Sequence, residues 1–315
     1  MKQLVLIIIA LLIVASFYFY IVGLDLGNEY FSPKYRDDEQ TAADVAVSGN
    51  SKISQSKKPK ATRQSDQLQA LPGKTEQTQA LFGQTDEPME TQPAVIQGDW
   101  ELIWVDEFDE PSLDMKKWIN VDRKDNYNNE LQYYTPNNSY VKDGFLYLTA
   151  KKEDKDGKEY TSGMVETRDK LLFCYGKIEA RMKLPTGRGV FPAFWILSQN
   201  GDNEIDIMEM IGNQPTIFYG VNHYMNKGKM CRAFGTTAND TPEEFHVYVL
   251  EWDEDTLKWY IDDTLFFETN KGVPSVDMYI IFTLAIGGNW PGSPSNDTVF
   301  PCSMVIDYVK LFRHI

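Results

Sequence analysis

The sequence predicts an all-β domain, a jelly-roll β-sandwich of two antiparallel sheets with a concave substrate cleft. Two observations lead to this prediction: short runs of alternating apolar and polar residues, and turn signals between them. The alternation has a period of two, which is the period of a strand and not of a helix. After about residue 99 the chain is also rich in Trp, Tyr, Phe and β-branched residues, which favour strands. We therefore expect one folded domain over residues 99–315, large enough to bury a core.

The individual strands and turns can be placed in order along this domain. The alternation is clearest over residues 145–149, 177–182, 245–250 and 257–261. Turn signals with Gly, Pro, Asp or Asn lie at residues 142–144, 156–157, 185–187, 262–263 and 287–289. Many short strands separated by such turns are typical of an antiparallel sandwich.

The N-terminal segment from Leu4 to Leu24 is apolar and uncharged, and it has about the length needed to cross a bilayer. Lys2 precedes it, so the positive-inside rule places the N-terminus in the cytoplasm. Residues 1–27 are therefore expected to anchor the protein to the membrane, with the rest of the chain extracytoplasmic. The alternative is a signal peptide cleaved after Ser16, which would give a secreted protein. Both interpretations export the domain.

Residues 28–98 are dominated by Gln, Thr, Ser, Lys, Asp and Pro and have no hydrophobic period. We expect a disordered polar linker that gives the anchored domain reach. The formal net charge is −15, which argues against nucleic acid or an anionic membrane surface as partner. A neutral polymer fits this charge better.

The three cysteines, Cys174, Cys231 and Cys302, lie far apart and lack the spacing of a zinc site. We expect buried free thiols, with one disulfide as the alternative outside the cytosol.

Residues 203–210 carry the most informative pattern. In a strand, Glu204 and Asp206 point to one face, whereas Glu209 at an odd offset points to the core. An unpaired carboxylate in the core is costly. A one-residue β-bulge near Met208 would return Glu209 to the face of the other two acids.

Three carboxyl groups on one face suit retaining glycoside hydrolysis. One carboxylate attacks the anomeric carbon, while a second, protonated carboxyl donates to the leaving oxygen. The middle Asp206 would help to separate the pKa values of the two glutamates. The alternative is a solvated acidic strand face.

Together with the ExDxxE pattern of Glu204, Asp206 and Glu209, six segments resemble the family 16 glycoside hydrolases, and most closely the laminarinase-like (endo-1,3-β-glucanase) branch. They are residues 104–108, 128–135, 175–181, 191–197, 284–292 and 306–309. The resemblance implies an endo-acting retaining hydrolase of β-1,3-glucan. It makes Glu204 the nucleophile, Glu209 the acid/base and Asp206 the assisting residue.

The expected sugar-binding residues are two tryptophans and two polar side chains. Trp195 and Trp290 can stack on the C–H faces of sugar rings, with packing in the core as the alternative. The resemblance implies that both tryptophans stack on sugar. It also implies that Asn129 and His223 form hydrogen bonds with the sugar, although a lone His on a strand is equally often structural.

The resemblance also implies a structural calcium site on the convex side, held by Glu107, the Gly144 carbonyl and Asp307. Oxygen ligands suit this ion, and salt-bridged surface acids are the alternative. No cofactor is expected for catalysis, and the catalytic domain is expected to be monomeric.

Two positions depart from the laminarinase pattern. Phe191 stands where Trp is usual, and Met164 stands where Arg is frequent. Both concern the walls of the substrate site, so the identity of the polysaccharide stays open. The alternatives are agar, carrageenan or mixed-linkage glucan as substrate, a non-catalytic glucan-binding protein, and a transglycosylase.

Overall fold

The computed structural model of the protein describes residues 96–238 and 241–315. The expected anchor at 1–27 lies outside these residues, as does the expected linker except for its last three positions. Ile96 and Gln97 already pair with the next strand, so the folded domain begins slightly before residue 99. Within the two described ranges, no helix is long and apolar enough to cross a membrane.

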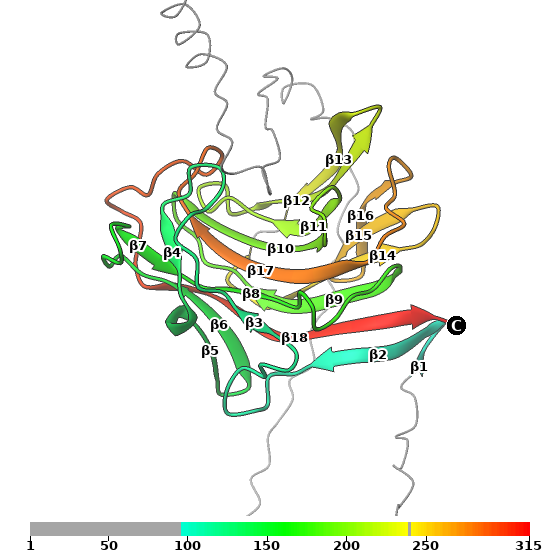
Figure 1. Cartoon of the computed structure of the whole chain (residues 1–315), viewed down its shortest axis with the longest axis horizontal. Coiled ribbons are helices and arrows are strands. Elements are labelled where there is room, and N and C mark those ends of the chain that lie inside the picture. Colours follow the sequence, from blue (N-terminus) through cyan, green and yellow to red (C-terminus); the bar gives the residue numbers. More distant parts are fainter. Residues whose placement is uncertain (1–95, 239–240) are drawn as a thin grey trace, which may run out of the picture. The chain divides into compact units, whose positions relative to one another are not determined.

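The described residues form two antiparallel sheets and one small parallel pair (Figure 1). The nine-stranded sheet has the order β1-β2-β18-β9-β14-β15-β16; in addition, β6 pairs with β18, and β5 pairs with β6. The seven-stranded sheet has the order β13-β12-β11-β10-β17-β8-β3. This arrangement confirms the predicted jelly-roll sandwich.

The strands of the nine-stranded sheet are β1 (Ile96–Gln97), β2 (Trp100–Asp106), β5 (Ser139–Lys142), β6 (Phe145–Ala150), β9 (Gly176–Lys183), β14 (His246–Trp252), β15 (Leu257–Ile261), β16 (Thr264–Thr269) and β18 (Cys302–His314). Those of the seven-stranded sheet are β3 (Ile119–Asn120), β8 (Met164–Glu166), β10 (Val190–Ser198), β11 (Glu204–Glu209), β12 (Ile217–Asn226), β13 (Lys229–Ala238) and β17 (Met278–Ile286). The parallel pair is β4 (Gln132–Tyr134) and β7 (Tyr160–Ser162), and a 3₁₀ turn, η1, spans Pro136–Asn138.

The four strands predicted from alternation are confirmed as β6, β9, β14 and β15, each within one or two residues of the expected bounds. The turns follow the predicted chemistry. Asp143 and Gly144 join β5 to β6 with φ of 52° and 78°, and Asp262 and Asp263 join β15 to β16 with φ of 47° and 66°. Positive φ at both central residues suits a two-residue hairpin.

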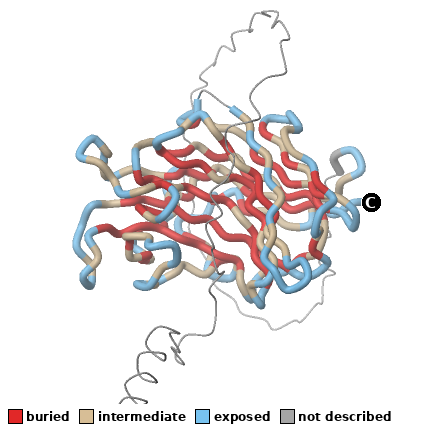
Figure 2. Tube along the Cα trace, turned by 90° about the horizontal axis from the view of Figure 1, so that it is seen from above, coloured by how far each residue is buried: buried red, intermediate tan, exposed pale blue. Residues whose placement is uncertain are grey.

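The main core lies between the two sheets, where buried positions follow the strands (Figure 2). Its largest fully buried side chains include Trp118, Trp252 and Trp259. A second apolar cluster contains Tyr134, Met164, Leu197, Tyr279 and Ile281. Because Leu197 and Tyr279 alternate with core residues on their strands, this cluster lies on the outer face of the seven-stranded sheet.

The three cysteines are free thiols and partly buried. The prediction of free thiols is therefore confirmed, while their burial is less complete than expected.

Candidate active site

The bulge predicted near Met208 is present in β11. Asp206 lies opposite Val221 of β12, and Glu209 lies opposite Tyr219. Three steps along β11 therefore match two steps along β12, so β11 holds one extra residue. The bulge places Glu209 on the same side as Glu204 and Asp206, and we call this outer side of the seven-stranded sheet the carboxylate face.

Packing holds the bulge in place. The consecutive residues Ile207 and Met208 are both buried in the main core. From the opposite sheet, the Trp259 indole nitrogen donates a hydrogen bond to the backbone oxygen of Asp206 at 2.9 Å. A Cβ atom at Gly220 would lie 2.6 Å from the Trp259 ring, so a glycine there gives this ring the room to reach β11.

His223 is a basic side chain that lies beside Glu204 and Asp206. Its Nε2 lies 3.1 Å from Asp206 Oδ2 and 3.7 Å from Glu204 Oε1. Burial lowers the pKa of His223, but the hydrogen bond to Asp206 and the charges of Asp206 and Glu204 outweigh burial and raise it overall. A protonated His223 therefore offsets part of the repulsion between two neighbouring acids.

The two glutamates have different proton affinities. Burial and the charge of Asp206 raise the pKa of Glu204 from 4.5 to about 7, although His223 acts in the opposite direction. Burial, followed by the charges of Asp206 and Glu204, raises the pKa of Glu209 well above its usual range. At neutral pH, Glu209 therefore keeps its proton while Glu204 can ionise. Two carboxyl groups whose environments separate their pKa values can serve as acid and nucleophile.

Both expected tryptophans lie at the carboxylate face. Trp195 of β10 lies opposite Asp206, and it is half-buried against the apolar cluster around Tyr279 and Ile281. Trp290 is 44% exposed and meets Tyr219 edge-on, with ring centroids 4.9 Å apart. Trp290 is therefore not packed in the core, whereas Trp195 packs partly against the second apolar cluster.

Asn129 lies in a loop that is joined to the Trp290 loop. Its side-chain amide donates to Asn289 Oδ1 at 2.7 Å, and the backbone nitrogen of Asn289 donates to Asn128 at 2.9 Å. The structure thus connects Asn129 with Trp290, while His223 and Trp195 lie directly beside the carboxylates.

The sequence analysis missed three residues on this face: Tyr219, Arg232 and Phe234. Tyr219 lies opposite Glu209, and burial together with the charge of Glu209 raises its pKa. Counting in steps of two from His223 along its strand reaches Tyr219, so the alternation held a usable signal. Arg232 and Phe234 depend on the pairing of β12 with β13.

The three positions expected to bind calcium lie in β18 or next to strands that pair with it. Asp307 lies in β18 between the segments that pair with β6 and β2, next to a register irregularity. Glu107 directly follows β2 and Gly144 directly precedes β6, and both strands pair with β18. The acids already have basic partners: Lys310 lies 3.6 Å from Glu107, and Arg181 lies 2.5 Å from Asp307. Oxygen donors fit calcium, but the ion must compete with these two cations.

Ligand atoms of Glu204, Asp206 and His223 lie within 4.8 Å of one another, close enough to hold a metal ion. A protonated His223 occupies the same two carboxylates, so the ion pair accounts for this grouping.

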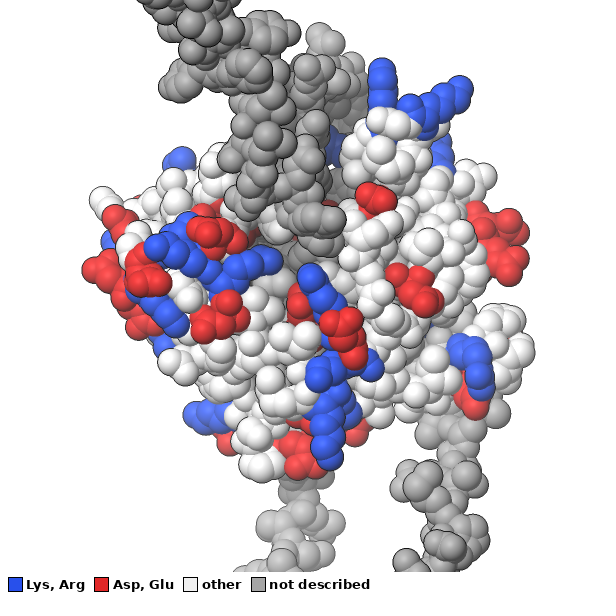
Figure 3. All heavy atoms as spheres, viewed as in Figure 1, with Lys and Arg blue, Asp and Glu red and all other residues white. Residues whose placement is uncertain are grey.

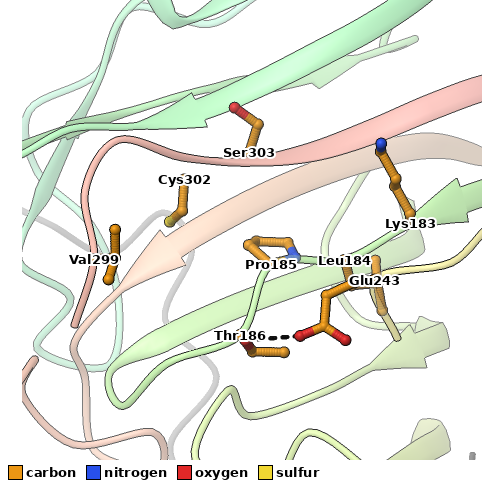
Figure 4. Close-up of a pocket in the computed structure, with 8 residues that line it drawn as sticks. All are labelled: Lys183, Leu184, Pro185, Thr186, Glu243, Val299, Cys302 and Ser303. Atoms are coloured by element: carbon orange, nitrogen blue, oxygen red, sulfur yellow. Dashed lines mark hydrogen bonds between the residues drawn. The ribbon is translucent and has the colours of Figure 1, made fainter. Parts of the chain in front are cut away.

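A pocket of about 320 Å³ lies outside the site described above, because none of the β11 carboxyl groups lines it (Figure 4). Its lining includes Lys183, Thr186, Cys302 and Glu243, and Thr186 donates to Glu243 at 3.0 Å. Burial raises the pKa of the Cys302 thiol to about 12, so this cysteine is a poor nucleophile at neutral pH.

A bulged strand with three carboxyl groups, flanked by tryptophans on an antiparallel jelly roll, defines a polysaccharide-cleaving hydrolase. Residues 125–310 match the profile of "Glycosyl hydrolases family 16". Residues 41–203 match that of "Beta-glucan synthesis-associated protein SKN1/KRE6/Sbg1".

Similar proteins agree with the first of these profiles. A beta-glucanase of Rhodothermus marinus is 35% identical over 246 residues, covering 69% of this chain and 86% of the relative. The laminarinase catalytic domain from Thermotoga maritima MSB8 has a TM-score of 0.64 and 34% identity, over 69% of this chain and 99% of that chain. The endo-β-1,3-glucanase from Pyrococcus furiosus has a TM-score of 0.64 and 36% identity, over 71% and 99%. This chain belongs to glycosyl hydrolase family 16, and it is a glycoside hydrolase.

Proposed function

We propose that this protein is an endo-acting β-1,3-glucanase that hydrolyses its substrate by double displacement. The observation that carries the proposal is the bulged strand β11, which sets Glu204, Asp206 and Glu209 on one face. The neighbours named as laminarinase and endo-β-1,3-glucanase support the linkage.

In the first step, the Glu204 carboxylate attacks the anomeric carbon and forms a covalent glycosyl ester. Glu209 donates its proton to the glycosidic oxygen, so the bond to the leaving sugar breaks and that sugar departs with a hydroxyl group. The raised pKa of Glu209 keeps this proton available at neutral pH. The ion pair between Asp206 and His223 lies next to the nucleophile and limits the repulsion that would disfavour its ionised form.

In the second step, Glu209 acts as a base. It takes a proton from water, the hydroxide attacks the anomeric carbon, and the ester bond to Glu204 breaks. Both active-site groups return to their starting protonation states, and the product keeps the β configuration.

We assign the sugar contacts to Trp195, Trp290 and Asn129. Trp195 adjoins the carboxylates and Trp290 is 44% exposed, so both can present an apolar face to a pyranose ring. Asn129 is exposed in a loop bonded to the second tryptophan's loop.

The experiment that tests the proposal is proton NMR of laminarin digestion, recorded before the products mutarotate. A first anomeric signal in the β configuration is expected. An initial α signal would mean direct displacement by water and would overturn the roles of Glu204 and Glu209. Sizing the products from a panel of β-glucans and galactans tests the substrate, and short oligosaccharides from laminarin are expected early.

A second candidate activity is transfer of the glycosyl group to another glucan chain. The match to a β-glucan synthesis-associated profile favours it, although that match ends at residue 203, directly before the nucleophile. Products longer than a starting oligosaccharide would identify transfer.

Two further proposals concern binding and location. We propose that Glu107, Gly144 and Asp307 bind a structural calcium ion; the proposal is supported by the pairing of β2 and β6, the strands next to Glu107 and Gly144, with β18, which contains Asp307. We also propose that residues 1–27 anchor an extracytoplasmic, monomeric catalytic domain to the membrane, on the basis of the apolar run from Leu4 to Leu24. Removing residues 1–27 should release active enzyme from the membrane fraction.

A further inference from the structure

The hairpin of β12 and β13 extends the carboxylate face beyond the catalytic strand. Phe234 lies opposite Val221, which lies opposite Asp206. Arg232 lies opposite His223 in the same way. Residues directly opposite one another in an antiparallel pair share a face, so Phe234 and Arg232 lie on the face that carries the catalytic acids.

This part of the face is unusually exposed for apolar side chains. Phe234 is 55% exposed, and Met225 and Met230 of the same hairpin are 48% and 40% exposed. The Arg232 guanidinium carbon lies 5.7 Å from the centre of the Phe234 ring, and Arg232 makes no ion pair within 4.0 Å with any residue that the structure describes. A contiguous group of exposed apolar side chains marks a binding surface, and Arg232 adds a charged donor to it, whose charge also acts on Glu209.

The hairpin also carries a group of basic side chains. Lys227 and Lys229 are exposed at its tip, close to Arg232 in sequence. Figure 3 shows Lys and Arg atoms gathered where Figure 1 places the end of this hairpin. Ammonium and guanidinium groups donate hydrogen bonds, which neutral sugar hydroxyls accept.

The position of this surface is fixed by packing on its other side. A Cβ atom at Gly235 of β13 would lie 2.4 Å from the ring of Phe267 on β16. The hairpin therefore lies against the nine-stranded sheet with no room for a side chain, and this close contact sets the direction in which Phe234 points.

The two sides of the catalytic strand differ in how open they are. Toward β10 and β17, Leu197 is 8% exposed, Ile281 1% and Tyr279 0%. On the other side, β13 is the edge strand of its sheet, and Phe234 is open to solvent. During double displacement, one part of the glycan stays bound to the nucleophile while the other part leaves and water enters. The side of β11 toward β13, which is open to solvent, therefore suits the part of the glycan that leaves.

We propose that Phe234 and Arg232 bind the leaving-group side of the glycan chain, with the Phe234 ring stacked on a pyranose ring and Arg232 donating to its hydroxyls. This inference rests on the proposed function, because it assumes that the substrate crosses β11 and is cut there. It assigns a substrate-binding role to β13, a strand whose side chains take part in neither step of the proposed mechanism.

The test compares two substrates that differ on the leaving-group side. Laminarihexaose extends over the hairpin, whereas 4-nitrophenyl β-laminaribioside places only a nitrophenyl group beyond the cleaved bond. Phe234→Ala should lower kcat/KM for laminarihexaose about 3- to 10-fold more than for the nitrophenyl glycoside, the range that corresponds to one aromatic contact. Phe234→Trp keeps a stacking ring and should restore most of the loss.

Ile103→Ala is the matched control, because Ile103 is an apolar strand residue of the other sheet and is 46% exposed. It should leave both substrates unaffected. Equal losses of Phe234→Ala on both substrates, or no loss on either while the wild type is active, would overturn the inference alone. A wild-type protein that leaves laminarin and both small substrates intact would overturn the proposed function and this inference together.

Discussion

Replacing the nucleophile by Glu204→Gln should abolish turnover and, at the same time, stabilise the fold at alkaline pH. The amide is nearly isosteric with the carboxyl group, so packing changes little. The variant cannot form the glycosyl ester, and loss of a nucleophile costs several kcal/mol in the barrier. The substitution also removes the Glu204 carboxyl group, whose ionisation destabilises the folded state.

The size of the stability effect follows from the pKa of Glu204. Folding raises it from 4.5 to about 7, which corresponds to about 3 kcal/mol at about 1.4 kcal/mol for each pH unit. Because the raised pKa favours the protonated form, the wild type loses stability as pH rises from about 4.5 to about 7 and stays at the lower level above that. The Glu204 side chain is still 28% exposed, so water screens part of the cost and we expect about 1.5–2 kcal/mol.

Thermal unfolding at pH 4 and at pH 9 measures this difference. At pH 4 the two proteins should unfold at similar temperatures. At pH 9 the variant should have a Tm roughly 3–8 °C higher, at about 2–4 °C per kcal/mol for a domain of this size. Glu110→Gln serves as the control, because Glu110 is an exposed carboxylate, and its Tm should follow the wild type at both pH values.

Two results would refute this reasoning. A variant that keeps more than about a tenth of wild-type activity on laminarin would remove Glu204 from the role of nucleophile. A Tm at pH 9 equal to or below that of the wild type would show that ionisation of Glu204 costs the fold nothing.

Three other predictions concern the surroundings of the site. His223→Asn removes the cation that lowers the pKa of Glu204, so the acidic limb of the kcat/KM profile should move to higher pH; an unmoved limb would contradict the ion pair. Trp259→Phe leaves the backbone oxygen of Asp206 without its donor and should cost about 1–3 kcal/mol in urea unfolding, with a fall in kcat as β11 loosens. Calcium should raise the Tm of the wild type by several degrees but not that of Asp307→Asn, and equal responses would exclude that site.

The sequence by itself determined the fold class and the carboxyl groups. Period-two alternation and turn residues such as Asp143 and Gly144 act locally, so the strands they predict can be located without tertiary information. The odd offset of Glu209 was informative for the same reason: strand geometry and the cost of burying a charge together require a bulge, and β11 has one.

Other features depend on contacts between residues far apart in the chain. His223 acts on Glu204 because it lies opposite this residue on the neighbouring strand β12. The indole of Trp259 reaches the backbone of Asp206 from the other sheet. Neither contact leaves a local pattern in the sequence, because a side chain's partner across a sheet is set by strand order and register.

The residues proposed to bind substrate also fall into two groups, those found from the sequence and those found only from the structure. The sequence picked out Trp195 and Trp290 by residue type and by their setting in the chain, whereas Phe234 in an ordinary alternating run looked like any strand residue. Only the tertiary structure decided that its side of β13 is the carboxylate face and that the opposite side is closed by Phe267 against Gly235. Local chemistry thus determined which residues can react, and the pairing of the strands decided which residues surround them.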